Sequence, residues 1–121
     1  MIEKYKNLIV WQKSVSLAVE IYKLTESFPK EEVYGLTSQM RRCSVSVASN
    51  IAEGKLRGYQ KEFKHFLMIA YGSGGELETQ ILIAKQLGKT ARLDYSKVDM
   101  LLEEIMKMLN KLVTNANSLK A

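Results

Sequence analysis

The residues of this chain that could carry chemistry are mainly cations, and they are unevenly distributed. Residues 41–65 hold six basic side chains against two acidic ones, whereas residues 1–40 balance five Lys with five Glu. Cations gathered in one segment can contact the phosphates of RNA or DNA, with an affinity that depends on salt and carries little sequence information. The candidate contacts form a basic cluster made of Arg41, Arg42, Lys55, Arg57, Lys61 and Lys64.

The basic cluster also has a second interpretation, in which its cations only keep an exposed surface hydrated. Arg42 shares a helical stripe with Glu53, so it could be the ion-pair partner of that carboxylate. Tyr59 and Tyr71 lie near the cluster in sequence and could add base stacking to phosphate contacts. Composition alone leaves both interpretations open.

A second candidate is the glycine cluster Gly72-Ser73-Gly74-Gly75, whose composition suits a phosphate-binding loop. However, it lacks the third glycine of the dinucleotide fingerprint G-x-G-x-x-G and the Gly-Lys-Ser/Thr ending of a Walker loop. Glu76 and Glu78 follow directly, and their carboxylates would repel phosphate. The glycine cluster is therefore not predicted to bind a nucleotide.

The glycine cluster instead lies within an apolar heptad that keeps its phase from Phe63 to Ile81, which predicts a continuous helix. Three glycines inside a helix cost about 1 kcal/mol each relative to Ala. We therefore expect close packing to offset this cost, with Trp11 or Tyr22 as the neighbour. A local kink is the alternative.

Sites of catalytic or metal-binding type are incomplete in this sequence. Glu62 and His65 have the spacing of a di-iron ligand pair, but a di-iron site needs two such pairs and the chain has one histidine. Cys43, the one cysteine, falls on an apolar stripe and is expected to be buried. We expect no metal, no other cofactor and no enzymatic activity.

Length and composition predict one domain over residues 1–121. The chain has a net charge of +5 and a hydrophobic content of 46%, which is ordinary for a globular protein. No stretch approaches the roughly 18 apolar residues of a membrane span, and the N-terminus lacks a signal-peptide core. We therefore expect a cytoplasmic protein without a membrane partner.

The positions of the apolar residues predict an all-α fold with four helices, at about 8–27, 36–54, 59–87 and 95–117. Asn7 and Asp94 stand where N-caps of the first and last helices are expected. Because the links are short, the predicted arrangement is an antiparallel up-down four-helix bundle.

The first two helices carry more apolar surface than one core needs. Beyond their core-facing stripes, additional apolar or small residues repeat at helical spacing, at Trp11, Val15, Ala18 and Tyr22 and at Val45, Ala48 and Ala52. A second buried surface would account for them, most simply in a homo-oligomer.

Residues 8–88 resemble a known family. The motifs that carry this resemblance are Val10-Trp11-Gln12, Phe28-Pro29 with Tyr34-Gly35-Leu36, Arg41-Arg42, Asn50-Ile51-Ala52-Glu53-Gly54, and Gly72-Ser73 with Glu76-Leu77-Glu78-Thr79-Gln80. They are similar to the four-helix-bundle family of the protein encoded in intervening sequences of bacterial 23S rRNA genes, also called S23 ribosomal protein. The last helix matches in pattern only, and Gly74 and Gly75 depart from the residues usual in the family.

The resemblance implies a homopentameric barrel of four-helix subunits. It also implies similarity to the accessory variability determinant of diversity-generating retroelements, a basic pentamer that binds nucleic acid and a reverse transcriptase. Five copies of this chain would carry a charge of about +25, which would attract a polyanion at low salt. The residues interpreted as fold or assembly positions of the motifs are Trp11, Asn50, Glu53, Gly54, Gly72 and Glu76.

Together, these features predict a basic, oligomeric helical bundle that binds RNA or DNA through backbone phosphates and performs no catalysis. The alternative is a scaffold for a protein partner, for example a reverse transcriptase or another nucleic-acid enzyme, without direct binding of nucleic acid.

Overall fold

The protein is all-α, as the sequence predicts. A computed structural model describes residues 4–120, with side chains described for residues 4–115. Within residues 4–120 there is no strand, and the elements in chain order are η1 (Lys4–Asn7), α1 (Ile9–Thr25), η2 (Lys30–Glu32), α2 (Leu36–Leu56), α3 (Gln60–Gln86) and α4 (Ser96–Lys120), where η marks a short 3-10 helix.

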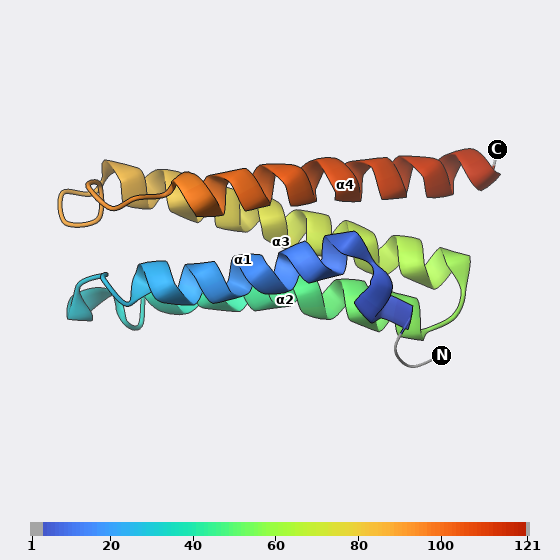
Figure 1. Ribbon diagram of the computed structural model, residues 1–121, viewed down its shortest axis with the longest axis horizontal. Helices are drawn as coiled ribbons and strands as arrows, with labels where there is room; N and C mark the ends of the chain where they lie inside the picture. Colours follow the sequence, from blue (N-terminus) through green and yellow to red (C-terminus); the bar gives the residue numbers. More distant parts are fainter. Residues whose placement is uncertain (1–3, 121) are drawn as a thin grey trace.

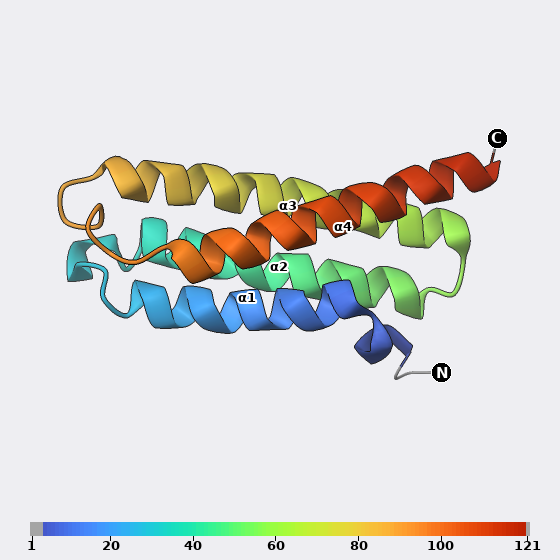
Figure 2. The same cartoon turned by 45° about the horizontal axis from the view of Figure 1, so that its top comes forward.

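The four α-helices lie lengthwise beside one another (Figure 1). The α1–α2 and α3–α4 connections lie at one end of the molecule, and the α2–α3 connection lies at the other. Helix α1 contacts α2 and α4, and α3 contacts the same two helices. Both views place η1 near the α2–α3 connection, where it packs on α1 and α2 (Figures 1 and 2).

The core is built from the apolar stripes that helical periodicity predicts. Each helix turns one stripe inward. The apolar side chains with almost no exposed surface come from all four helices: Val10, Leu17 and Ile21 of α1, Met40, Val47 and Ile51 of α2, Leu67, Ala70, Leu77, Ile81 and Ala84 of α3, and Ile105 and Leu109 of α4. Burial of this continuous apolar interior is the main stabilising contribution to the bundle.

The N-terminus of α1 differs from the prediction, because Asn7 is not its N-cap. Residues 4–7 form η1, so Leu8 precedes the helix and no side chain caps it. The N–H of Leu8 donates to the Tyr5 carbonyl at 3.1 Å, and the Leu8 carbonyl accepts from Gln12 at 3.1 Å. The backbone of η1 thus leads directly into α1, and a capping side chain is not used.

The glycine cluster lies inside α3, which runs without interruption from Gln60 to Gln86. A Cβ added at Gly74 would clash with the Met106 sulfur, so the close neighbour at this point is α4. The expectation that Trp11 or Tyr22 packs there is wrong. At Gly72 and Gly75 nothing lies within 4 Å of the added Cβ, so packing inside the subunit does not offset their cost to the helix.

Helices α2 and α3 approach each other closely at Gly54 of α2. A Cβ added there would lie 2.7 Å from the Cβ of Phe66 and 3.3 Å from the main-chain oxygen of Phe63. Neither atom belongs to the end of a flexible side chain, so α2 or α3 would have to move to admit even a methyl group. Gly54 therefore fixes how closely α2 and α3 pack.

Alanine substitutions at Gly54 and Gly75 should have opposite effects on the free energy of unfolding. We expect Gly54→Ala to lower it by about 1–2 kcal/mol, because overpacking outweighs the gain in helix propensity. Gly75→Ala meets open space and should raise it by about 0.5–1 kcal/mol. Chemical denaturation at one protein concentration measures both, and equal effects of the two substitutions would contradict this packing.

Candidate nucleic-acid interface and assembly face

The basic cluster, continuous in sequence, does not form one surface in the fold. Arg41 and Arg42 lie in the second turn of α2, near the α1–α2 connection, whereas Lys55 lies near the opposite end of the same helix. The fourteen positions from Arg41 to Lys55 span about 21 Å along a helix. The two arginines are thus separated from the other cations, which surround the α2–α3 connection.

Arg41 holds α1 and α2 together. Its Nε donates to the Thr25 hydroxyl at 2.8 Å, and its Nη2 donates to the Tyr22 carbonyl at 3.3 Å. Its guanidinium also lies 4.5 Å from the centre of the Tyr22 ring. The Tyr22 carbonyl, in the last turn of α1, also accepts from the Glu26 N–H at 3.2 Å, so Arg41 adds a further donor to it. The structure thus gives Arg41 a role within the subunit that the basic-cluster prediction did not include.

Arg42 is exposed, and no ion pair is found for it among residues 4–115. The suggested pairing of Arg42 with Glu53 is wrong. Glu53 instead pairs with Arg57, whose Nε lies 3.0 Å from Glu53 Oε2. The reason is geometric, because Arg57 is one helical turn from Glu53 whereas Arg42 is three turns away.

The remaining four cations form what we call the distal basic group, which lies around the α2–α3 connection and consists of Lys55, Arg57, Lys61 and Lys64. Lys55 Nζ lies 5.2 Å from the centre of the Phe63 ring, and the Arg57 guanidinium lies 5.1 Å from that of Phe66. In the described part of the chain, Lys55, Lys61 and Lys64 make no ion pair. Three of the four cations of the distal basic group are therefore free of carboxylates, as Arg42 is near the other end of α2.

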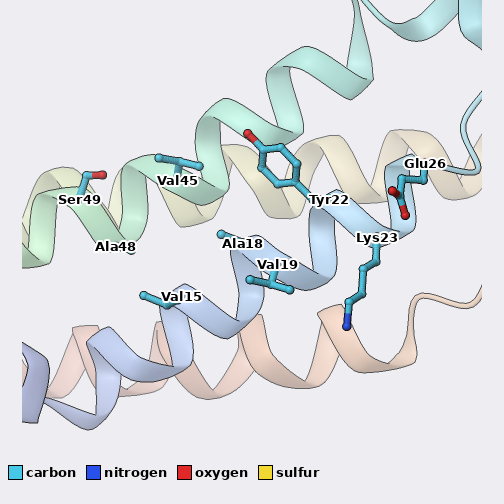
Figure 3. A pocket seen from close by; sticks show the side chains of 9 residues that line it. All are labelled: Val15, Ala18, Val19, Tyr22, Lys23, Glu26, Val45, Ala48 and Ser49. Carbon is cyan, nitrogen blue, oxygen red and sulfur yellow. The ribbon is translucent and has the colours of Figure 1, made fainter.

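The additional apolar residues of α1 and α2 face one open hollow between these helices. Figure 3 shows Val15, Ala18, Val19 and Tyr22 on α1 beside Val45, Ala48 and Ser49 on α2. The hollow has a volume of about 450 Å³, and 47% of Val19 and 42% of Val45 is exposed. We call this surface the α1–α2 face. It is contiguous apolar surface that the subunit leaves exposed.

Trp11 and Ala52, which were predicted to belong to the same spare stripes, are half-buried. The Trp11 ring packs edge to face on Tyr5 of η1, with ring centres 5.1 Å apart, and also against the core. The N-terminal segment thus covers Trp11, and this residue lies outside the hollow. That packing could not be read from the sequence of α1 alone.

Of the other motif residues, Asn50 lies along the α2–α3 seam, whereas Gly72 and Glu76 lie on the exposed side of α3. The Asn50 amide donates to the carbonyl and hydroxyl oxygens of Ser46, at 2.8 and 2.9 Å, and the Ser46 and Ser73 hydroxyls lie 2.9 Å apart. Asn50 therefore supports contact between α2 and α3. Gly72 and Glu76 are exposed on α3, which leaves their side of this helix free of contacts from within the subunit.

Further along the seam, the buried side chain of Gln80 on α3 contacts the exposed Gln39 and the buried Cys43 of α2, which the sequence did not predict. The Gln80 amide donates to the Gln39 Oε1 at 3.4 Å and to the Cys43 sulfur at 3.5 Å. Burial raises the pKa of the Cys43 thiol. Gln39 lies on α2 and Gln80 lies on α3. Helical periodicity could have placed both residues near the α2–α3 seam, but it could not have predicted their contact.

Among the described residues, no group of three or more His, Cys, Asp or Glu side chains is placed to hold a metal ion. His65 is exposed and packs edge to face on Phe66, with ring centres 5.3 Å apart. No helix within the described residues combines the length and apolar character needed to cross a membrane.

Comparison with known families agrees with this architecture. The model of the family described as 23S rRNA-intervening sequence protein matches residues 6–111. The chain belongs to this family. The resemblance stated from the sequence motifs is thereby confirmed, and the match extends into α4, which the motifs did not cover. The comparison with curated proteins found no match.

In this 23S rRNA-intervening sequence family protein, the adjacent arginines should respond differently to substitution by lysine. Arg41→Lys loses the two guanidinium hydrogen bonds and the guanidinium contact with the Tyr22 ring, so we expect the free energy of unfolding to fall by about 1–2 kcal/mol. Arg42→Lys, the matched control, should change it by less than about 0.5 kcal/mol. Urea denaturation followed by circular dichroism measures both, and a large effect at Arg42 would contradict the assignment.

Proposed function

We propose that this protein is a non-catalytic cytoplasmic homo-oligomer that binds RNA or DNA through backbone phosphates. In this proposal each subunit is an antiparallel up-down bundle. The observation that carries it is the distal basic group, in which Lys55, Lys61 and Lys64 have no ion-pair partner among residues 4–115. Cations free of carboxylates bind phosphate with release of counterions, so that binding weakens as salt rises.

Self-association is supported by the α1–α2 face. Its apolar side chains are about half-exposed in the isolated subunit, and a second copy covering them would remove that surface from water. The family resemblance suggests a pentameric barrel. A closed ring would repeat the distal basic group once in each subunit and raise the local positive potential, even though each subunit has a net charge of only +5.

The alternative function is a scaffold that binds a protein partner, such as a reverse transcriptase or another nucleic-acid enzyme, without touching nucleic acid. Two observations favour it: Arg41 is engaged within the subunit, and Glu53 partly neutralises Arg57. Both reduce the number of cations available to phosphates. Direct binding measurements separate the two functions.

The nucleic-acid proposal predicts a specific change in salt dependence. Lys61→Ala combined with Lys64→Ala should weaken binding of single-stranded RNA or DNA and of duplex DNA. It should reduce the slope of log K against log salt by about 1.4–1.8, because two phosphate contacts are lost. Fluorescence anisotropy titrations at several salt concentrations measure this slope.

The matched control is Lys30→Ala combined with Arg92→Ala, which removes the same charge from exposed positions outside the distal basic group. This control should leave both affinity and slope close to those of the wild type. Equal losses in the two double variants would show only a net-charge effect. Absence of binding by the wild type at low salt would favour the scaffold.

The assembly proposal predicts that a charge on the α1–α2 face dissociates the oligomer. Val19→Glu should shift the protein to smaller species in sedimentation velocity, because it places a carboxylate in a buried apolar contact. Val33→Glu is the matched control, since Val33 is 49% exposed, like Val19 at 47%, but lies outside the face. An unchanged sedimentation coefficient for folded Val19→Glu would refute this assignment.

A further inference from the structure

A hollow of about 370 Å³ lies at the end of the bundle that carries the distal basic group. Its lining comes from η1, the C-terminal end of α2, the α2–α3 connection and the beginning of α3. Figures 1 and 2 show η1 beside the C-terminal end of α2. Its volume is in the range of about 300–1,000 Å³ that is typical of small-ligand sites. The residues lining it include Lys4, Lys55, Leu56, Gly58, Tyr59 and Phe63.

Two cations from distant parts of the sequence line this hollow. Lys4 comes from η1, which packs on α2, and Lys55 comes from the last turn of α2. Within the described residues, neither ammonium group has a carboxylate partner. The residues that line the hollow include no acidic side chain, so the charge of the two cations is uncompensated there. This arrangement suits a phosphate group.

An aromatic platform stands beside these cations. Tyr59 is 74% exposed, its backbone is extended, and its side chain makes no capping hydrogen bond to α3. It therefore contributes little to the packing of the subunit. Phe63 adds a second aromatic side chain to the wall, and the Lys55 ammonium lies near its ring. Aromatic rings next to cations are the combination with which proteins bind single strands, by stacking the bases and neutralising the backbone.

Access to the hollow is open at Gly58, the residue before Tyr59. Gly58 has φ 78°, and nothing lies within 4 Å of the position that a Cβ would occupy. A bulky ligand can therefore approach along the α2–α3 connection without meeting a side chain at this position.

We propose that this hollow binds one nucleotide unit of a single-stranded nucleic acid, with the phosphate between Lys4 and Lys55 and the base stacked on Tyr59. A base within a duplex is already stacked and cannot use the ring, so the site selects single strands. The inference rests on the proposed nucleic-acid function and deepens it. It adds Lys4, which the basic cluster did not include, and gives Tyr59 a defined role.

The test uses the full chain with fluorescein-labelled oligothymidylate, oligouridylate and a DNA duplex of mixed sequence as probes. Tyr59→Ala should weaken binding of both single strands about tenfold and leave duplex binding within about twofold, because one stacked base is lost. Tyr59→Phe keeps the ring and should retain single-strand affinity. Tyr34→Ala is the matched control, because Tyr34 is 94% exposed but lies in the α1–α2 connection, outside the hollow. It should not change binding.

A second arm of the test removes the cations. Lys4→Ala combined with Lys55→Ala should reduce the salt slope for single strands by about 1.4, as expected for two phosphate contacts. Circular dichroism checks that each variant is folded, and Lys4→Ala alone, at an exposed position, should give half of this change.

The outcomes distinguish the two proposals. If the wild type binds in a salt-dependent manner and both Tyr59→Ala and Lys4→Ala bind as tightly as the wild type, nucleotide binding in the hollow is refuted. The proposed nucleic-acid function then still stands. Equal loss of single-strand and duplex binding in Tyr59→Ala also refutes base stacking. If the wild type binds none of the probes at low salt, the nucleic-acid function itself fails. Comparison of oligothymidylate with oligouridylate shows whether the site prefers DNA or RNA.

Discussion

The close approach of α2 to α3 at Gly54 is the constraint on which the rest of the molecule depends. Because Phe63 and Phe66 of α3 pack directly on this glycine, the two helices are held together near the connection that joins them. The same approach lets the hydroxyls of Ser46 and Ser73 meet further along the seam. It also sets the distance between the cations at the C-terminal end of α2 and those in the first turns of α3. The geometry of the distal basic group thus follows from a packing contact rather than from charge.

The fold assigns different tasks to different parts of one small bundle. The inward stripes form the core, the α1–α2 face exposes apolar side chains, and the end near the α2–α3 connection exposes cations and an aromatic ring. The α1–α2 face and the end near the α2–α3 connection are separate surfaces. A substitution in one of them should therefore leave the other unchanged. Arg41 belongs to neither surface, since its hydrogen bonds serve the joint between α1 and α2.

Sequence periodicity predicted the helices and the spare apolar stripes well, because both depend on spacing within one helix. It failed where two elements meet. The sequence analysis grouped six cations because they lie in one segment. In the fold, Arg41 lies far from Lys55 because both belong to one long helix. Met106 as the neighbour of Gly74, and Lys4 in the hollow beside the distal basic group, depend on contacts between segments distant in sequence. Charge balance within residues 1–40 gave no reason to single out Lys4.

The most direct test of the central claim, that an oligomer of these bundles presents repeated phosphate-binding ends, is native mass spectrometry of the wild-type protein with a single-stranded oligonucleotide. The account predicts one defined oligomer, with the mass of five chains if the family resemblance extends to assembly, and oligonucleotide adducts that disappear as ammonium acetate is raised. A monomer that carries no oligonucleotide at low salt would contradict it.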